Sequence, residues 1–134
     1  MPGYSGTPLP KKLGIKDGLR VHLTGIPPEV RAALSAELSR CKTRADGDDL
    51  LDFAMVFAKS KATLISEVEG LAARLATAGM LWISWPKKSS GVTTDLDENV
   101  VRQIGLAAGL VDVKVCAVTE IWSGLKFVRR LKDR

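Results

Sequence analysis

The sequence predicts an α/β domain in which helices cover both faces of a mostly parallel sheet. Short apolar runs rich in strand-forming residues alternate along the chain with segments whose apolar residues recur at helical spacing. The chain then closes with two strand-like runs that no helix separates, which favours a terminal antiparallel hairpin. With 134 residues, 46% of them hydrophobic, a single domain of this kind can bury a core without disulfides or metal ions.

Residues 1–18 are rich in glycine and proline, and they predict an irregular arm with at most a short turn at 11–13. The folded α/β domain is expected to span 19–134. The apolar side chains that can attach the arm to its core are Leu9, Leu13 and Ile15.

The first strand is expected over 19–24, where apolar and polar residues alternate as far as Gly25. Pro27 and Pro28 then begin a helix, because proline in the first turn of a helix loses no hydrogen bond. The apolar face of this helix consists of Val30, Ala33, Leu34 and Leu38. A short edge strand is expected to follow at 41–44.

The most apolar strand is expected over 50–58, whose centre is unbroken by charge, as is typical of a strand covered on both faces. Ser60 is a candidate N-cap for a long helix that ends before Gly79. The next strand is expected over 80–85.

A further helix is predicted to begin at Asp95 and Glu98, which have the spacing of a capping box, and to stop at Gly109. Two strands follow, over 111–118 and 125–130. The turn between them is short, so this last pair is expected to form the hairpin.

Together these elements form a Rossmann-like, three-layer sheet, because strands joined by helices run parallel with right-handed crossovers. A sheet of this kind that finishes in an antiparallel hairpin resembles the S-adenosylmethionine-dependent methyltransferase fold. The segment between Cys41 and Leu50 is too short for the third strand and helix of that fold, so the resemblance is to a shortened version. It is a resemblance of architecture, which by itself implies no activity.

Three stretches carry a more specific resemblance: YSGTPL with KKLGI in 4–15, WPKKSSGVTTDL in 85–96 and WSGLKFV in 122–128. Together they resemble a bacterial family of short stand-alone proteins, domain-of-unknown-function family 3052. The resemblance covers nearly the whole chain and implies a bacterial, stand-alone protein. It implies no reaction, cofactor or catalytic residue.

The strand expected at 80–85 stops at Pro86 and opens into a polar loop. Because the carboxyl ends of parallel strands share one edge of a sheet, where ligands bind, we expect the polar and aromatic residues that follow the strands to meet there. The candidate ligand-binding residues are Thr24, Gly25, Lys59, Ser60, Trp85, Lys87, Lys88, Ser89, Ser90, Gly91, Glu120 and Trp122.

The loop that follows Pro86 has the chemistry of an anion site. Lys87 and Lys88 supply positive charge, Ser89 and Ser90 supply hydroxyl donors, and the flexible backbone at Gly91 can turn N–H groups toward a phosphate or carboxylate. No catalytic constellation accompanies them. The favoured hypothesis is a non-catalytic Rossmann-like module that binds an anionic small molecule or a protein partner at this edge.

A purely structural interpretation stands beside this hypothesis. Trp82 and Trp85 face opposite sides of their strand and can both be core residues, while the loop after them is simply solvated. Trp122, at a strand end, can either cap the core or form a stacking wall.

The enzymatic alternative is a reduced S-adenosylmethionine-dependent methyltransferase. Such an enzyme needs a glycine-rich turn after the first strand and an acidic residue after the second strand for the ribose hydroxyls. The turn at 24–28 holds one glycine and two prolines, and proline lacks the N–H that would face a ligand. Asp46 and Asp48 are the available acids, although a solvated loop role is favoured for them. S-adenosylmethionine is therefore a disfavoured cofactor.

Few residues fit a catalytic role. His22, the only histidine, lies within the first strand, where hydrogen-bonded packing is favoured over catalysis. Cys41 and Cys116 have no Cys-x-x-Cys spacing and no histidine cluster nearby, so neither a metal site nor a disulfide is predicted. Glu120 is the one carboxylate expected at the ligand-binding edge, and a surface ion pair is favoured over an acid–base role.

The net charge of +5 and the pI of about 9.4 favour anionic partners. The basic residues are scattered and no aromatic row accompanies them, so nucleic-acid binding through Lys11, Lys12 and 129–134 is the weaker alternative. No apolar run approaches the ~20 residues of a membrane span, and the N-terminus lacks a leader pattern. We therefore expect a cytoplasmic protein with no membrane partner.

Overall fold

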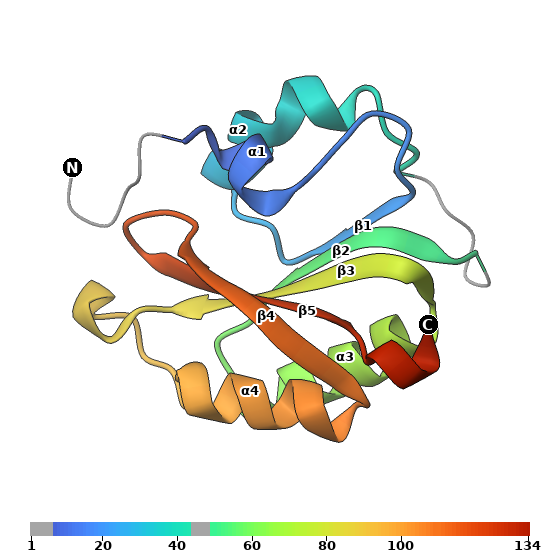
Figure 1. Cartoon of the computed structure of the whole chain (residues 1–134). Coiled ribbons are helices and arrows are strands. Elements are labelled where there is room, and N and C mark those ends of the chain that lie inside the picture. Colours follow the sequence, from blue (N-terminus) through green and yellow to red (C-terminus); the bar gives the residue numbers. More distant parts are fainter. Residues whose placement is uncertain (1–6, 44–48) are drawn as a thin grey trace.

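The computed structural model describes residues 7–43 and 49–134 (Figure 1). The elements in chain order are α1 Leu9–Leu13, β1 Val21–Thr24, α2 Pro28–Leu38, β2 Leu51–Phe57, α3 Lys61–Ala73, β3 Leu75–Pro86, α4 Glu98–Ala107, β4 Leu110–Ala117 and β5 Trp122–Arg129. Two short 3-10 turns, η1 Lys88–Ser90 and η2 Leu131–Asp133, follow β3 and β5. Within the described ranges no helix has the length and apolar character to cross a membrane.

The five strands form one sheet in the order β1-β2-β3-β5-β4. β1, β2 and β3 run parallel, whereas β5 is antiparallel to both of its neighbours, β3 and β4. The predicted α/β class, the mostly parallel sheet and the final hairpin are confirmed. The last strand in the chain lies inside the sheet, and β4 forms the edge.

Helices cover the sheet on both faces, which gives three layers (Figure 1). α1 and α2 pack on one face, against a buried cluster that includes Phe53, Met55 and Trp82. α3 and α4 pack on the other face, against the alternate residues of the same strands, such as Ala54 and Ile83. This division follows from the period of two in a β-strand, which points successive side chains to opposite faces.

The N-terminal arm packs into the buried cluster on the face that α1 and α2 cover. Leu13 is fully buried, Ile15 is nearly so, and Leu9 packs against the same cluster. The indole N–H of Trp82 donates a buried hydrogen bond of 2.8 Å to the carbonyl oxygen of Leu13. Gly14 ends α1 at a φ of 80°, a left-handed conformation that favours glycine.

The chain reverses direction beside β1. After α2, Lys42 pairs in parallel with Arg20 on the outer side of β1: the Lys42 N–H donates to the Leu19 carbonyl oxygen over 2.8 Å, and the Val21 N–H donates to the Lys42 carbonyl oxygen over 2.9 Å. The edge strand predicted at 41–44 is thus reduced to one bridge, and Arg44 lies outside the described residues. The chain then returns to β2 on the other side of β1.

This reversal explains why α2 and α3 lie on opposite faces. When successive right-handed crossovers add strands toward the same edge of a sheet, their helices lie on one face. When the next crossover leads toward the opposite edge, its helix lies on the other face. The connection after α2 leads outward from β1, whereas the connection through α3 leads inward from β2 to β3. The topological switch point of the sheet therefore lies between β1 and β2.

The boundary between α3 and β3 differs from the prediction. The helix was expected to continue to just before Gly79, but it ends at Ala73, and β3 begins at Leu75, which pairs with Leu51. The register then shifts before Phe53 pairs with Met80. A Cβ on Gly79 would lie 2.6 Å from the Leu51 carbonyl oxygen, so this bulge requires glycine.

The cap of α4 also differs. Asp97, rather than Asp95, accepts the Val100 N–H over 2.8 Å, and the helix begins at Glu98. Asp95 instead accepts the backbone N–H of Lys61 at the start of α3, over 2.7 Å. The two acids thus serve the N-termini of two different helices, which helix dipoles favour.

The turn of the final hairpin is shorter than expected. β5 begins at Trp122 rather than near Leu125, because Trp122 already pairs with Pro86 of β3. The Thr119 hydroxyl oxygen accepts the N–H groups of Ile121 and Trp122, which closes the turn.

Candidate functional site

A groove of about 530 Å³ lies at the switch point, where β1 and β2 end. Its walls come from the β1–α2 turn, from the residues that follow β2 and from the start of β5. The lining includes Gly25, Pro27, Pro28, Lys59, Ser60 and Trp122. Ligand pockets in proteins have volumes of roughly 300–1,000 Å³, so this groove is large enough for a small organic molecule.

Two aromatic rings form one wall. Phe57 ends β2 and meets Trp122 edge to face, with ring centroids 5.2 Å apart and an interplanar angle of 81°. Trp122 is only 8% exposed, although it lines the groove. This geometry is favourable between aromatic rings and holds the indole in one orientation. The wall therefore offers a fixed apolar surface.

The β1–α2 turn forms the second wall and offers few hydrogen-bond donors. Gly25 has a φ of 67°, and a Cβ there would lie 2.7 Å from the Phe57 carbonyl oxygen, so the turn packs directly on the end of β2. Pro27 and Pro28 have no N–H, and Glu29 places a carboxylate in the first turn of α2. An anion at this helix N-terminus would therefore find few donors and a like charge.

Lys59 and Ser60 contribute the polar part of the lining. Lys59 is exposed, and its carbonyl oxygen accepts the Thr94 hydroxyl over 2.6 Å, which fixes the backbone beneath its side chain. The Ser60 Oγ accepts the Thr63 N–H over 3.2 Å, so Ser60 caps α3 as predicted. Lys59 is the cationic residue among the described residues that line the groove.

The loop Lys87–Gly91 lies at the same edge of the sheet, but outside this groove. The Lys87 N–H donates to the Ile121 carbonyl oxygen over 2.8 Å, next to Trp122. The Ser90 hydroxyl donates to the Lys87 carbonyl oxygen over 2.6 Å and accepts the Val92 N–H. Gly91 has a φ of 76°, and Lys88 and Ser89 are exposed. The Ser90 hydroxyl and the backbone of the loop thus bond mainly within the loop.

The remaining candidates lie elsewhere. Trp85 is 5% exposed and packs in the core beneath α3 and α4, on the face opposite Trp122. Thr24 ends β1, and its Oγ1 lies 3.0 Å from the Nε2 of His22, which supports the packing role expected for that histidine. Glu120 lines a separate hollow together with Glu29.

The basic C-terminus is bonded to the fold. The Arg129 guanidinium donates to the carbonyl oxygens of Ala72 and Leu75, and that of Arg130 donates to the Leu106 carbonyl oxygen. Lys12 donates to the Ala117 carbonyl oxygen over 2.9 Å. These cations stabilise ends of helices and strands.

The structure therefore brings together Gly25, Lys59, Ser60 and Trp122 and separates them from Trp85. Sequence reasoning did not identify Phe57, Pro27 and Pro28 as lining residues. Phe57 was assigned to the core of its strand, and only its position as the last residue of that strand signals a place at the edge. Within the described residues, no cluster of three histidine, cysteine, aspartate or glutamate side chains can hold a metal ion.

Comparison with known proteins identifies the fold. No family model matches the chain, and no curated protein matches it in sequence. Among solved structures it is similar to an SAM-dependent methyltransferase from Aquifex aeolicus, with a TM-score of 0.59 and 15% identity over 87% of this chain and 85% of that chain.

Two further structures have the same kind of similarity. Magnesium protoporphyrin IX methyltransferase from Synechocystis, with bound SAH, has a TM-score of 0.57 and 14% identity, over 85% of this chain and 75% of that chain. A putative methyltransferase from Thermoplasma acidophilum has a TM-score of 0.59 and 9% identity, over 95% and 76% of the respective chains. The chain thus has a methyltransferase-like Rossmann fold.

Proposed function

We propose that this chain is a reduced methyltransferase-like domain that binds S-adenosylmethionine, or a ligand of the same adenosyl and amino-acid chemistry, in the groove between the ends of β1 and β2. The observation that carries the proposal is the position of the groove at the topological switch point, which is where open α/β sheets bind their ligands. The methyltransferases of similar fold, solved with bound SAH or SAM, support this choice of ligand.

The lining residues fit part of such a ligand. The Lys59 ammonium can pair with the ligand's carboxylate, and the Trp122 indole gives its apolar or adenine part a surface to pack on. The two prolines remove backbone donors from the β1–α2 turn, where a cofactor would approach the backbone. Asp46 and Asp48, the acids available for the ribose hydroxyls, lie outside the described residues. We therefore expect weak binding.

The lining also limits any reaction. None of the described residues that line the groove is a carboxylate or an imidazole, so none is a ready general base for an acceptor. When bound, S-adenosylmethionine supplies an activated methyl group, and without a base in this lining its acceptor would need a free lone pair, as a neutral amine or an already ionised group has. The role of this chain is then to bind and orient the two molecules.

Calorimetric titration of the full chain with S-adenosylmethionine and with S-adenosylhomocysteine tests the proposal. We expect saturable binding that Lys59→Ala weakens by about tenfold, the loss of one charge-assisted contact. Lys88→Ala is the matched control, because Lys88 is an exposed lysine at the same edge but outside the groove. Absence of binding at millimolar ligand would contradict the proposal.

A second candidate is the non-catalytic module that binds an anion or a protein partner at Lys87–Gly91. It is favoured by the proline-rich β1–α2 turn, which offers few donors, and by the left-handed Gly91 that follows two lysines in the loop. Lys59→Ala and Lys88→Ala distinguish this second function from binding of S-adenosylmethionine in the groove. Binding of inorganic phosphate that Lys88→Ala abolishes and Lys59→Ala leaves unchanged would support this second function.

A further inference from the structure

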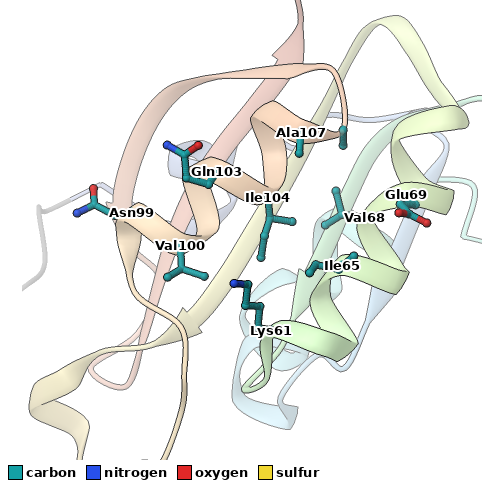
Figure 2. A pocket seen from close by; sticks show the side chains of 10 residues that line it. Lys61, Ile65, Val68, Glu69, Asn99, Val100, Gln103, Ile104 and Ala107 are labelled. Atoms are coloured by element: carbon teal, nitrogen blue, oxygen red, sulfur yellow. The ribbon is translucent and has the colours of Figure 1, made fainter.

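A second groove, of about 460 Å³, lies between α3 and α4 (Figure 2), on the far side of the sheet from α1 and α2 (Figure 1). Its floor is apolar and includes Val68, Val100 and Ile104. Ile65 of α3 stands at its rim and is 39% exposed. An isoleucine that borders an apolar groove in solvent marks a candidate interaction surface.

The two charged residues of α3 that line the groove lie symmetrically about Ile65. Lys61 and Glu69 line the same groove, and each is four residues from Ile65, so the three side chains form one row along the helix (Figure 2). Lys61 and Glu69 are each about 6 Å from Ile65 along the helix axis, on opposite sides of it. Along α3 the row therefore consists of a positive side chain (Lys61), an apolar one (Ile65) and a negative one (Glu69).

We propose that α3, along the rim of this groove, packs against α3 of a second copy of this chain, in a two-fold symmetric dimer. An axis close to Ile65 runs the two α3 helices antiparallel, because a two-fold contact presents the same patch from both subunits. Lys61 of each copy then faces Glu69 of the other copy, and the two Ile65 side chains meet at the centre. The row on α3 is thus complementary to itself, which specifies a second copy rather than an unrelated helix.

The surroundings of the row permit close approach. Ala62, Ser66 and Ala73, on the exposed side of α3, are small. On α4 the polar rim consists of the uncharged amides Asn99 and Gln103, which repel neither Lys61 nor Glu69 of the second copy (Figure 2). The resulting arrangement is a layer of four helices, with the two α3 helices at its centre and one α4 on each side.

Charge-swap variants in sedimentation equilibrium test this dimer. Lys61→Glu and Glu69→Lys each place like charges across both symmetric contacts, and we expect each to raise the dimer dissociation constant by about tenfold or more. The double variant K61E/E69K restores two opposite pairs with the signs exchanged, so it should return the dimer toward wild-type affinity. Ile65→Asp should give a monomer.

The controls separate loss of the dimer from loss of the fold. The double variant places Glu near the start of α3 and Lys near its end, which the helix dipole favours, so it should fold at least as well as the wild type. Val113→Asp changes another exposed apolar residue, on β4, and should leave the dimer intact. A wild-type chain that stays monomeric at high concentration, or a double variant no better than the single variants, would overturn the proposal.

Discussion

Gly25 and Phe57 hold the ends of β1 and β2 in direct contact. A Cβ on Gly25 would lie 2.7 Å from the Phe57 carbonyl oxygen, and the φ of Gly25 is 67°. The same approach shapes one wall of the groove at the switch point. Glycine is required here for two reasons, the left-handed backbone conformation and the close contact with Phe57. Substitution of Gly25, compared with substitution of a glycine that has only the left-handed conformation, separates the two energetic costs.

We expect Gly25→Ala to lower the free energy of unfolding by more than the ~1–2 kcal/mol that a left-handed conformation costs an L-residue. The additional loss of stability is the cost of displacing the β1–α2 turn from β2. Gly18→Ala is the control, because Gly18 has a φ of 81° and nothing lies within 4 Å of its Cβ position. Urea unfolding of both variants measures the difference, and equal losses would show that the contact with Phe57 is not tight.

Two glycines within helices should respond in opposite directions to the same substitution. Gly70 of α3 has no atom within 4 Å of an added Cβ, so Gly70→Ala should stabilise the chain by ~1 kcal/mol through helix propensity alone. A Cβ on Gly105 of α4 would lie 2.0 Å from the buried ring of Phe127. Gly105→Ala should therefore destabilise the chain by ~1–3 kcal/mol through overpacking.

Thermal unfolding at one fixed protein concentration measures both glycine variants. A stabilising Gly105→Ala would mean that α4 can move away from β5 at little cost. A destabilising Gly70→Ala would mean that the added methyl group is not in open space in the folded chain.

The N-terminal arm depends on one buried hydrogen bond. Trp82→Phe removes the indole N–H that donates to the Leu13 carbonyl oxygen over 2.8 Å, and it leaves that oxygen buried and unpaired. The expected cost is ~1–3 kcal/mol. Hydrogen exchange should quicken in 9–15 while α4 keeps its protection, and uniform loss of protection along the chain would contradict the local role assigned to this bond.

Acid should weaken one ion pair at the start of β2. The Arg20 guanidinium donates to the Asp52 carboxylate at 2.9 and 3.0 Å, and this hydrogen bonding lowers the pKa of Asp52. A carboxylate whose folded pKa is depressed contributes stability above its unfolded pKa of about 4 and loses it as the pH falls through the folded pKa.

Asp52→Asn removes that contribution. The variant should be less stable than the wild type at neutral pH, and the difference should shrink as the pH falls below about 4. Chemical unfolding as a function of pH measures it. A difference that stays constant down to strongly acidic pH would show that the pair gives no pH-dependent stability.

Local sequence patterns predicted the elements well where one interaction decided them. Ser60 was recognised as a cap because a serine before a helical stripe satisfies a free N–H, and the structure confirms this role. The helix predicted to end before Gly79 includes Leu75, because the helical spacing of its apolar residues continues as far as Leu75. Only its pairing with Leu51, distant in sequence, makes it the start of β3.

The candidate site could also be predicted only where local sequence or strand direction decides a residue's position. Lys59, Ser60 and Trp122 could be predicted from strand ends, since the edge depends only on strand direction. The separation of Trp85 from Trp122 depends on which face each side chain occupies. The contact between Phe57 and Trp122 joins strands that are not neighbours in the sheet, and no local pattern encodes it.

We propose that an adenosyl ligand binds between the ends of β1 and β2. Titration of isotope-labelled protein with S-adenosylmethionine, followed by amide and indole N–H resonances, tests it most directly. We predict that Gly25, Lys59, Ser60 and the indole of Trp122 shift together, while the buried indole of Trp82 stays unchanged. Shifts confined to Lys87–Gly91, or no shifts at saturating ligand, would contradict it.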